Sequence, residues 1–159
     1  MDIFDEDLLK FWRSLTKTGV RFLMIGGVAT NLHGYHRTTN DIDLWVDNSS
    51  SNRKKLRAAF KDYGIGDFQS LETMQFVAGW STFRLDSNLE VDIMTNVKGL
   101  ENYSFDEAFQ MASIADIFDL KIPFLHINQL ITSKKAANRS KDQIDVMELE
   151  KIKKLREEE

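Results

Sequence analysis

The chain has 159 residues, of which 42% are hydrophobic and 29% are charged, and its formal net charge is −4. This balance is typical of a folded globular protein and excludes extensive disorder, while the acidic total argues against broad electrostatic binding of DNA or RNA, although a local basic patch can coexist with it. The absence of cysteine excludes disulfides, thiolate catalysis and cysteine-ligated zinc, which leaves oxygen ligands, and therefore Mg²⁺ or Mn²⁺, as the expected metal chemistry.

The length suits one domain over residues 1–159, with no repeat or proline-rich linker to divide it. The apolar stretches are too short to cross a bilayer, so we expect no membrane association. The acidic N-terminus lacks the basic-then-apolar order of a secretory signal, and we therefore expect a cytoplasmic location.

The first elements along the chain are a helix, a strand and a second helix. Residues 5–17 have apolar side chains at spacings of three and four, which predicts an amphipathic helix. Residues 20–25 form a short apolar run that ends in Gly26-Gly27, and residues 28–33 have the length of a short helix. We expect a strand, a tight turn and a helix start.

Residues 41–47 alternate between apolar and polar side chains, which predicts a half-buried strand. Asp41 and Asp43 then share one face with Trp45. An indole on that face could stack on a base, although an aromatic side chain on a sheet more often packs against its neighbours.

The later part of the chain predicts further strands and helices. In order they are a basic helix over residues 52–63, strands over residues 75–78, 82–86 and 89–94, a short helix over residues 104–111, a strand over residues 122–127, a helix capped by Asn128 that runs to residue 137, and a charged helix from about residue 141.

The chemistry is concentrated in Gly26-Gly27, Asp41, Asp43 and Asp92. Residues i and i+2 of a strand point the same way, so the two aspartates of one strand can reach one metal centre, and Asp92 can complete the site if its strand lies alongside. Three carboxylates on one face repel one another unless cations neutralise them. The arrangement therefore favours a site for two metal ions.

Each part of this set also has a structural interpretation. A lone Asp-x-Asp is usually a solvated strand end, and a lone Gly-Gly is usually a turn. At the start of a helix, however, a Gly-Gly turn presents backbone N–H groups that suit a triphosphate. The order of strand, Gly-Gly, helix, Asp-Ile-Asp strand and a later strand with Asp92 favours the functional interpretation of the whole set.

This order is accompanied by further matching positions, namely Gly26-Gly27-Val28-Ala29, His33-Gly34, Arg37, Thr39 and Asp41-Ile42-Asp43-Leu44. The motif resembles the signature of minimal nucleotidyltransferases of the polymerase-beta-like superfamily, in particular the branch related to abortive-infection type IV toxins and small bacterial relatives. The resemblance is close over residues 20–46 and looser over residues 134–145.

The resemblance implies an α/β (α+β) fold with a mixed sheet flanked by helices, a catalytic core over about residues 20–95 and a short helical C-terminal segment over about residues 128–159. It also implies magnesium as cofactor and a nucleoside triphosphate as substrate. Carried over by position, Gly26 and Gly27 correspond to the phosphate-binding turn, Asp41 and Asp43 to the metal pair, and Asp92 to the third metal-binding carboxylate, so that these three aspartates are the expected catalytic residues.

Other matching positions have two interpretations each. Arg37 and Thr39 precede the metal pair, and Arg37 could pair either with phosphate oxygens or with a neighbouring carboxylate. Lys134 could reach the triphosphate, because the leaving pyrophosphate needs positive charge, or lie on a solvated helix surface. Asp142 fits a carboxylate at a helix N-terminus as well as it fits catalysis.

We therefore expect an enzyme that moves a nucleoside monophosphate from ATP or another triphosphate to an acceptor hydroxyl on an RNA end, a protein or a small molecule. The alternative is a non-catalytic, nucleotide-binding or antitoxin-like protein that keeps the fold. The intact set of three aspartates favours the enzyme. A toxin or antitoxin partner, or a second copy of the chain, could complete the acceptor site.

Overall fold

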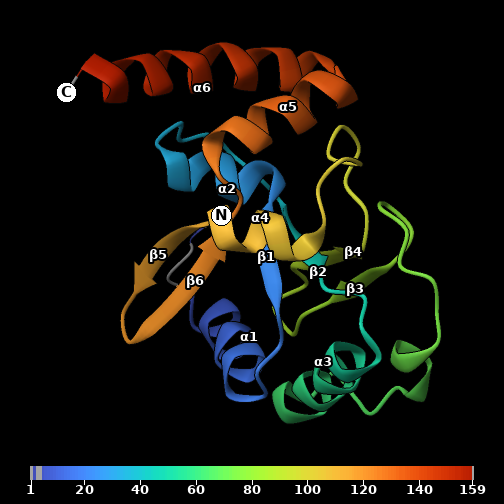
Figure 1. Cartoon of the computed structure of the whole chain (residues 1–159). Coiled ribbons are helices and arrows are strands. Elements are labelled where there is room, and N and C mark those ends of the chain that lie inside the picture. Colours follow the sequence, from blue (N-terminus) through green and yellow to red (C-terminus); the bar gives the residue numbers. More distant parts are fainter. Residues whose placement is uncertain (1, 3–4, 159) are drawn as a thin grey trace.

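The computed structural model describes residue 2 and residues 5–158 and is built around a six-stranded sheet. Its strands are β1 (Phe22–Ile25), β2 (Asp41–Val46), β3 (Thr82–Arg84), β4 (Glu90–Met94), β5 (Ser113–Ile117) and β6 (Leu120–Phe124). They are ordered β3-β4-β2-β1-β6-β5 across the sheet (Figure 1). The β2–β4 and β1–β6 pairs are parallel and the other three pairs are antiparallel. This confirms the expected mixed sheet.

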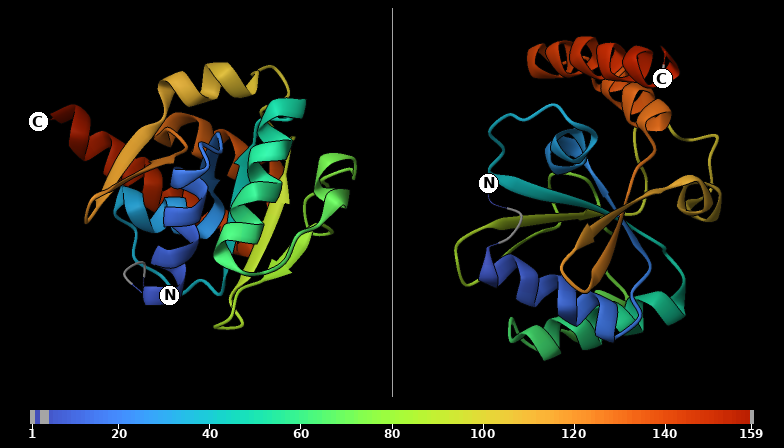
Figure 2. Two further views of the ribbon diagram at one scale, coloured as in Figure 1. Left: turned by 90° about the horizontal axis from the view of Figure 1, so that it is seen from below. Right: turned by 90° about the vertical axis from the view of Figure 1, so that its left-hand side faces the viewer.

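Helices cover both faces of the sheet (Figure 2). They are α1 (Glu6–Lys17), α2 (Gly26–His33), α3 (Ser50–Tyr63), α4 (Phe105–Met111), α5 (Ile127–Ala137) and α6 (Ser140–Glu158), with a 3-10 turn at Gln69–Glu72. α1 and α3 lie side by side on one face, and α2, α5 and α6 are stacked on the other. Among the described residues, no helix combines the length and the apolar composition that crossing a bilayer requires.

The apolar stripe of α1 explains how this helix packs. Leu8, Phe11 and Leu15 recur at helical spacing and are fully buried, while the Asp5 side chain caps the helix by accepting from two backbone N–H groups. Phe11 meets Tyr63 of α3 edge to face at 5.6 Å. α1 and α3 therefore share one core beneath the sheet.

The register of β2 places the aspartates. Asp43 is aligned with Ile25 of β1 on one side and with Asp92 of β4 on the other. Since neighbouring strands lie about 4.8 Å apart, the end of β1 and two carboxylate-bearing positions are brought together across three adjacent strands.

Two expectations about the strands are wrong. Residues 75–78 form a loop rather than a strand. β5, which was not expected, pairs with β6 at the edge of the sheet. Its alternation is weak because Ile114 is exposed on this edge strand, so the usual apolar pattern of a half-buried strand is absent.

The ends of two helices also differ from expectation. α2 begins at Gly26 itself, so the glycines are the first helical residues rather than a turn before the helix. α5 begins at Ile127, and His126, not Asn128, is its N-cap: the His126 ring accepts from the backbone N–H of Asn128 at 3.1 Å. An imidazole nitrogen here performs the role that a Ser or Asp oxygen usually has.

Candidate active site

One pocket of about 440 Å³ contains every residue that the sequence predicted for the site. It lies where the start of α2, β2 and β4 meet the α5–α6 segment. The predicted residues among its lining are Gly26, Gly27, Arg37, Thr39, Asp41, Asp43, Asp92 and Lys134. The structure therefore brings together positions that are up to 108 residues apart in the chain.

The Asp43 carboxylate lies against the backbone of Gly26. A Cβ atom on Gly26 would stand 2.2 Å from Oδ2 of Asp43, and Gly26 has a φ of +67°. Both the contact and the left-handed backbone require glycine at this position. The first residue of α2 and the middle of β2 are thus in direct contact.

Burial, and after it the negative charges of Asp41 and Asp92, raise the pKa of Asp43 to about 7. Lys134 and Lys141 act in the opposite direction. Within the described part of the chain, no protein donor forms a hydrogen bond to the Asp43 carboxylate. A buried carboxylate in this state is stabilised by a cation.

Asp92 is held by the segment that precedes β3. Its Oδ2 accepts from the backbone N–H of Gly79 at 2.6 Å, and its Oδ1 accepts from the Thr82 hydroxyl at 3.3 Å. Burial raises the pKa of Asp92 despite these hydrogen bonds, and Asp41 and Glu90 add to that direction. Its carboxylate is oriented by the protein, whereas that of Asp43 is not.

The three carboxylates fit a hard divalent cation by their chemistry, since oxygen donors with net negative charge are what Mg²⁺ and Mn²⁺ prefer. They do not form a closed ligand set: among residue 2 and residues 5–158, no three His, Cys, Asp or Glu side chains are already grouped closely enough to hold an ion by themselves. Asp41, Asp43 and Asp92 could thus hold a metal together with oxygens from a substrate.

The N-terminus of α2 opens toward the same pocket. Its N-cap, Ile25, provides no side-chain hydrogen bond, so the first backbone N–H groups of the helix lack a side-chain cap. Gly27 lies close to Thr39, because a Cβ atom on this glycine would stand 2.7 Å from the threonine Oγ1. The helix start can therefore bind an anion beside the carboxylates.

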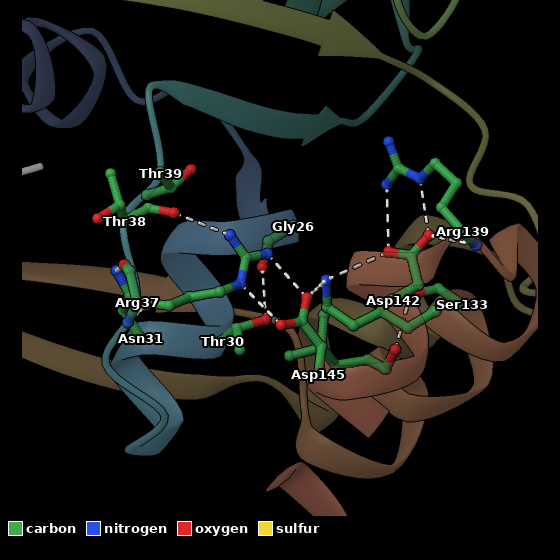
Figure 3. Close-up of polar contacts among 12 residues, drawn as sticks. Gly26, Thr30, Asn31, Arg37, Thr38, Thr39, Ser133, Arg139, Asp142 and Asp145 are labelled. Atoms are coloured by element: carbon green, nitrogen blue, oxygen red, sulfur yellow. Dashed lines mark hydrogen bonds and ion pairs between the residues drawn. The ribbon is translucent and has the colours of Figure 1, made fainter. Parts of the chain in front are cut away.

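Arg37 is paired with a carboxylate, which is one of its two predicted interpretations. Its Nε and Nη2 donate to the two oxygens of Asp145 in α6, each at 2.7 Å (Figure 3). Lys134 donates to Asp145 at 2.7 Å as well, and its side chain is buried. Burial by itself would raise the pKa of Asp145, but the hydrogen bonds from Arg37 and Lys134 hold it below its ordinary value. Lys134 is thus not a solvated helix residue.

Asp142 lies in the first turn of α6 and holds Arg139. Its Oδ2 accepts from the backbone N–H of Arg139 at 3.0 Å and from its Nε at 2.7 Å (Figure 3). The pKa of Arg139 is raised first by this hydrogen bond, and the charges of Asp43 and Asp41 contribute. Arg139 is therefore within electrostatic range of the aspartate pair.

Trp45 packs rather than facing the pocket. It is buried, its Nε1 donates to the carbonyl of Thr95 at 3.1 Å, and its ring meets Phe105 edge to face at 5.6 Å. The packing interpretation is confirmed.

The sequence did not indicate several other residues that line the pocket. They come from two loops and are Ala78, Gly79, Asn96, Val97 and Lys98. Loops of this kind have no periodicity, so the only local signal was the glycine at position 79 between two expected strands.

A glycine-started helix beside three carboxylates on adjacent strands of a mixed sheet is the arrangement of a nucleotidyltransferase. The comparison with protein families agrees: the chain belongs to the family described as "Nucleotidyl transferase of unknown function (DUF2204)", which matches residues 4–159. The fold is similar to the crystal structure of a Thermotoga maritima protein described as a candidate nucleotidyltransferase, with a TM-score of 0.55 and 18% sequence identity over 94% of this chain and 88% of that one. No protein of curated function matches the chain.

Proposed function

We propose that the chain moves a nucleoside monophosphate from a nucleoside triphosphate to an acceptor hydroxyl, with Asp41, Asp43 and Asp92 holding Mg²⁺ or Mn²⁺. The observation that carries the proposal is the half-buried Asp43 carboxylate, which accepts no hydrogen bond from the described residues and lies against the first glycine of α2. Membership of a nucleotidyl transferase family gives this carboxylate its expected context.

In the proposed reaction the acceptor oxygen forms a bond to the α-phosphorus while the bond from that phosphorus to pyrophosphate breaks. When bound, the metal ions neutralise the triphosphate and lower the pKa of the attacking hydroxyl. The N–H groups at the start of α2 bind phosphate oxygens. Arg139 and Lys141, which line the same pocket, stabilise the charge that develops on the leaving pyrophosphate.

In this proposal Asp92 acts on the side of the pocket where the acceptor binds. Gly79 and Thr82 fix its carboxylate, so it presents one geometry to an ion. Lys134 and Arg37, which share Asp145, hold the α5–α6 segment against the loop after α2 and thereby close the phosphate side of the pocket. The relation to the abortive-infection type IV toxin branch, and a toxin, antitoxin or second-copy partner, stay predictions of the sequence.

The test is transfer of label from each of the four α-labelled ribonucleoside triphosphates to RNA ends, proteins and small-molecule hydroxyls in the presence of Mg²⁺. Asp43→Asn should lower the transfer rate about a thousandfold or more, because loss of a carboxylate that would hold the metal removes several kcal/mol of transition-state stabilisation. The variant should melt at or above the temperature of the wild type in EDTA, since it removes a buried charge near two others.

Asp119→Asn is the matched control, because Asp119 is exposed and pairs with Arg13 outside the pocket. It should transfer label at the wild-type rate. Near wild-type transfer by Asp43→Asn, or melting of that variant far below wild type in EDTA, would show that the carboxylate is structural. Nucleotide binding without transfer to any acceptor would favour the non-catalytic alternative.

A further inference from the structure

Trp80 is exposed to solvent and directly follows Gly79, which lines the candidate active site. Of the three tryptophans in the chain, Trp12 and Trp45 are buried, with 0% and 3% of their surface exposed, whereas Trp80 is 86% exposed. Burying a side chain of this size stabilises a fold, and that contribution is absent for Trp80. The indole therefore offers a large apolar face to a ligand.

The backbone that carries this indole is well fixed. The N–H groups of Trp80 and Ser81 donate to the carbonyl of Val77 at 2.9 and 3.1 Å, and the N–H of Val77 donates to the Ser81 hydroxyl at 2.9 Å. Ser81 is buried, and its carbonyl accepts from the N–H of Ile93 in β4 at 2.9 Å. The exposed ring thus stands on a turn that is hydrogen-bonded to the sheet.

The same turn holds one of the candidate metal ligands. Gly79, the residue before Trp80, donates its N–H to Asp92 Oδ2 at 2.6 Å and lines the pocket. The backbone of Trp80 is therefore linked to the Asp92 carboxylate through one residue, Gly79, and one hydrogen bond.

Sheet order places Trp80 on the side of the pocket opposite the phosphate-binding turn. In the order β3-β4-β2-β1, the glycines of α2 follow β1, the aspartate pair lies on β2, Asp92 lies on β4, and Trp80 leads into β3. Figure 1 shows the loop before β3 at the right-hand side of the sheet, beyond β2 and β4 as seen from α2. A triphosphate on α2 would thus leave the side near Trp80 to the acceptor.

The geometry points to Trp80 as a stacking platform for the acceptor: the acceptor carries a nucleobase next to its reactive hydroxyl, and this base stacks on the indole. This inference rests on the proposed function. An indole stacks on any base and contributes binding without reading its sequence. Lys98 is an exposed pocket residue that forms no ion pair within the described residues, so it can bind a phosphate flanking the base.

The proposed acceptor is a ribonucleoside with a free hydroxyl. It could be a free nucleoside or the terminal residue of an RNA strand, and the probes distinguish the two. The probes are adenosine, uridine, single-stranded hexaribonucleotides with a free 3′ hydroxyl, and a hexamer of the same backbone without bases. Each is added to the full chain with Mg²⁺ and a non-hydrolysable triphosphate. Fluorescence of Trp80 is the readout, because acrylamide quenches an exposed indole selectively while Trp12 and Trp45 are buried.

A base-bearing probe should protect Trp80 from acrylamide, and the abasic hexamer should not. In calorimetry, Trp80→Ala should weaken binding of that probe about 10- to 100-fold, as expected for the loss of one stacked base, while Trp80→Phe restores most of it. Binding of the triphosphate analogue should stay unchanged. Protection by hexamers alone identifies a strand end as acceptor, and protection by free nucleosides identifies a small molecule.

Phe118→Ala is the matched control, because Phe118 is an exposed aromatic residue in the turn between β5 and β6, at the opposite edge of the sheet. It should bind every probe as wild type does. The inference is overturned if the abasic hexamer or a serine-containing peptide protects Trp80 equally, or if Trp80→Ala weakens the triphosphate instead. Absence of nucleotidyl transfer with protection intact would refute the proposed function but not the stacking role.

Discussion

Gly26 shows how strongly a single residue can be constrained by a neighbouring functional group. A helix interior or first turn normally favours a side chain over glycine, since glycine loses more conformational entropy on folding. Here the absence of Cβ lets Asp43 approach the backbone, and the φ of +67° lies in the region that favours glycine. Glycine at this position therefore makes the start of α2 less stable but allows the Asp43 carboxylate to contact the helix N-terminus.

We predict that Gly26→Ala both destabilises the fold and displaces Asp43. The new Cβ would lie 2.2 Å from the Asp43 Oδ2. Gly19→Ala is a matched control, because Gly19 has a similar φ of +76° but its nearest neighbour is a Lys55 side-chain atom at 3.9 Å. Gly19→Ala should therefore cost only the left-handed strain of about 1 to 2 kcal/mol.

Urea denaturation gives the comparison directly. Gly26→Ala should lose more unfolding free energy than Gly19→Ala, and it should also lose binding of a triphosphate analogue with Mg²⁺, which Gly19→Ala keeps. Equal losses for the two variants would mean that Asp43 can move aside freely.

At the scale of elements, strong periodicity was predictive and weak periodicity was not. The alternation of residues 41–47 correctly predicted β2, and the helical spacing of apolar residues correctly predicted α1. Residues 75–78 contain a short apolar run that looks like a strand, but the turn around Trp80 is fixed by hydrogen bonds to Ser81 instead of by strand pairing. Propensity over four residues is too weak to override such tertiary contacts.

His33 joins three elements at the end of α2. Its Nε2 lies 2.7 Å from the carbonyl of Leu125, just after β6, so that nitrogen is the donor. Its Nδ1 then faces the guanidinium of Arg156 in α6 at 3.3 Å, and Arg156 also donates to the His33 carbonyl. The ring packs against Phe124 at 4.7 Å between centroids. The neutral imidazole suits this position, because a second proton would face a cation.

Burial lowers the pKa of His33 to about 4, and the charges of Arg156 and His126 act in the same direction. Between about pH 6.5 and 4 the unfolded chain therefore binds a proton that the folded chain does not, and the contribution of His33 to stability is lost as pH falls through this window. We predict that His33→Gln, which keeps an N–H donor for Leu125, removes this part of the acid sensitivity.

The measurement is the free energy of unfolding in urea at several pH values from 4 to 7. Wild type should lose stability more steeply than His33→Gln toward pH 4, even though the variant starts lower at pH 7 because the ring packing is lost. His36→Gln is the control, because His36 is exposed in the loop after α2 and should leave the slope unchanged. Parallel curves for wild type and His33→Gln would contradict the buried, neutral imidazole.

For the molecule as a whole, the predicted site proved to be one pocket because its motif residues are local in sequence and adjacent in the sheet. Gly26 through Asp43 span α2 and the first half of β2, directly after β1, so their proximity followed from the pattern. The Arg37–Asp145 pair and the Gly79–Asp92 hydrogen bond join distant segments. No local pattern encodes which loop or helix lies over a site, and these contacts were therefore found only in the structure.

The pocket combines opposite charges, and this has a consequence for binding. Three carboxylates lie near the α2 N-terminus, and Lys134, Arg139 and Lys141 line the same pocket. A triphosphate alone is attracted by the cations but repelled by the carboxylates, and a metal ion alone lacks a closed set of ligands among the described residues. The metal ion and the triphosphate should therefore each bind more tightly when the other is present.

We predict that Mg²⁺ and a non-hydrolysable triphosphate stabilise the protein together by more than the sum of their separate effects. Coupling of this kind is reciprocal, so Mg²⁺ should tighten triphosphate binding by the same factor as the triphosphate tightens Mg²⁺ binding. A ligand present at 100 times its Kd adds about 2.7 kcal/mol to the free energy of unfolding, which raises the melting temperature by several degrees for a chain of this size. Melting curves with neither, either and both ligands, with calorimetry for the two affinities, measure the coupling. Asp119→Asn should keep the coupling and Asp43→Asn should lose most of it, because Asp43 is a carboxylate beside two others that accepts no hydrogen bond from the described residues and is therefore stabilised by a cation. Additive shifts in the wild type, or tight Mg²⁺ binding without triphosphate, would place the metal and the phosphates in separate sites.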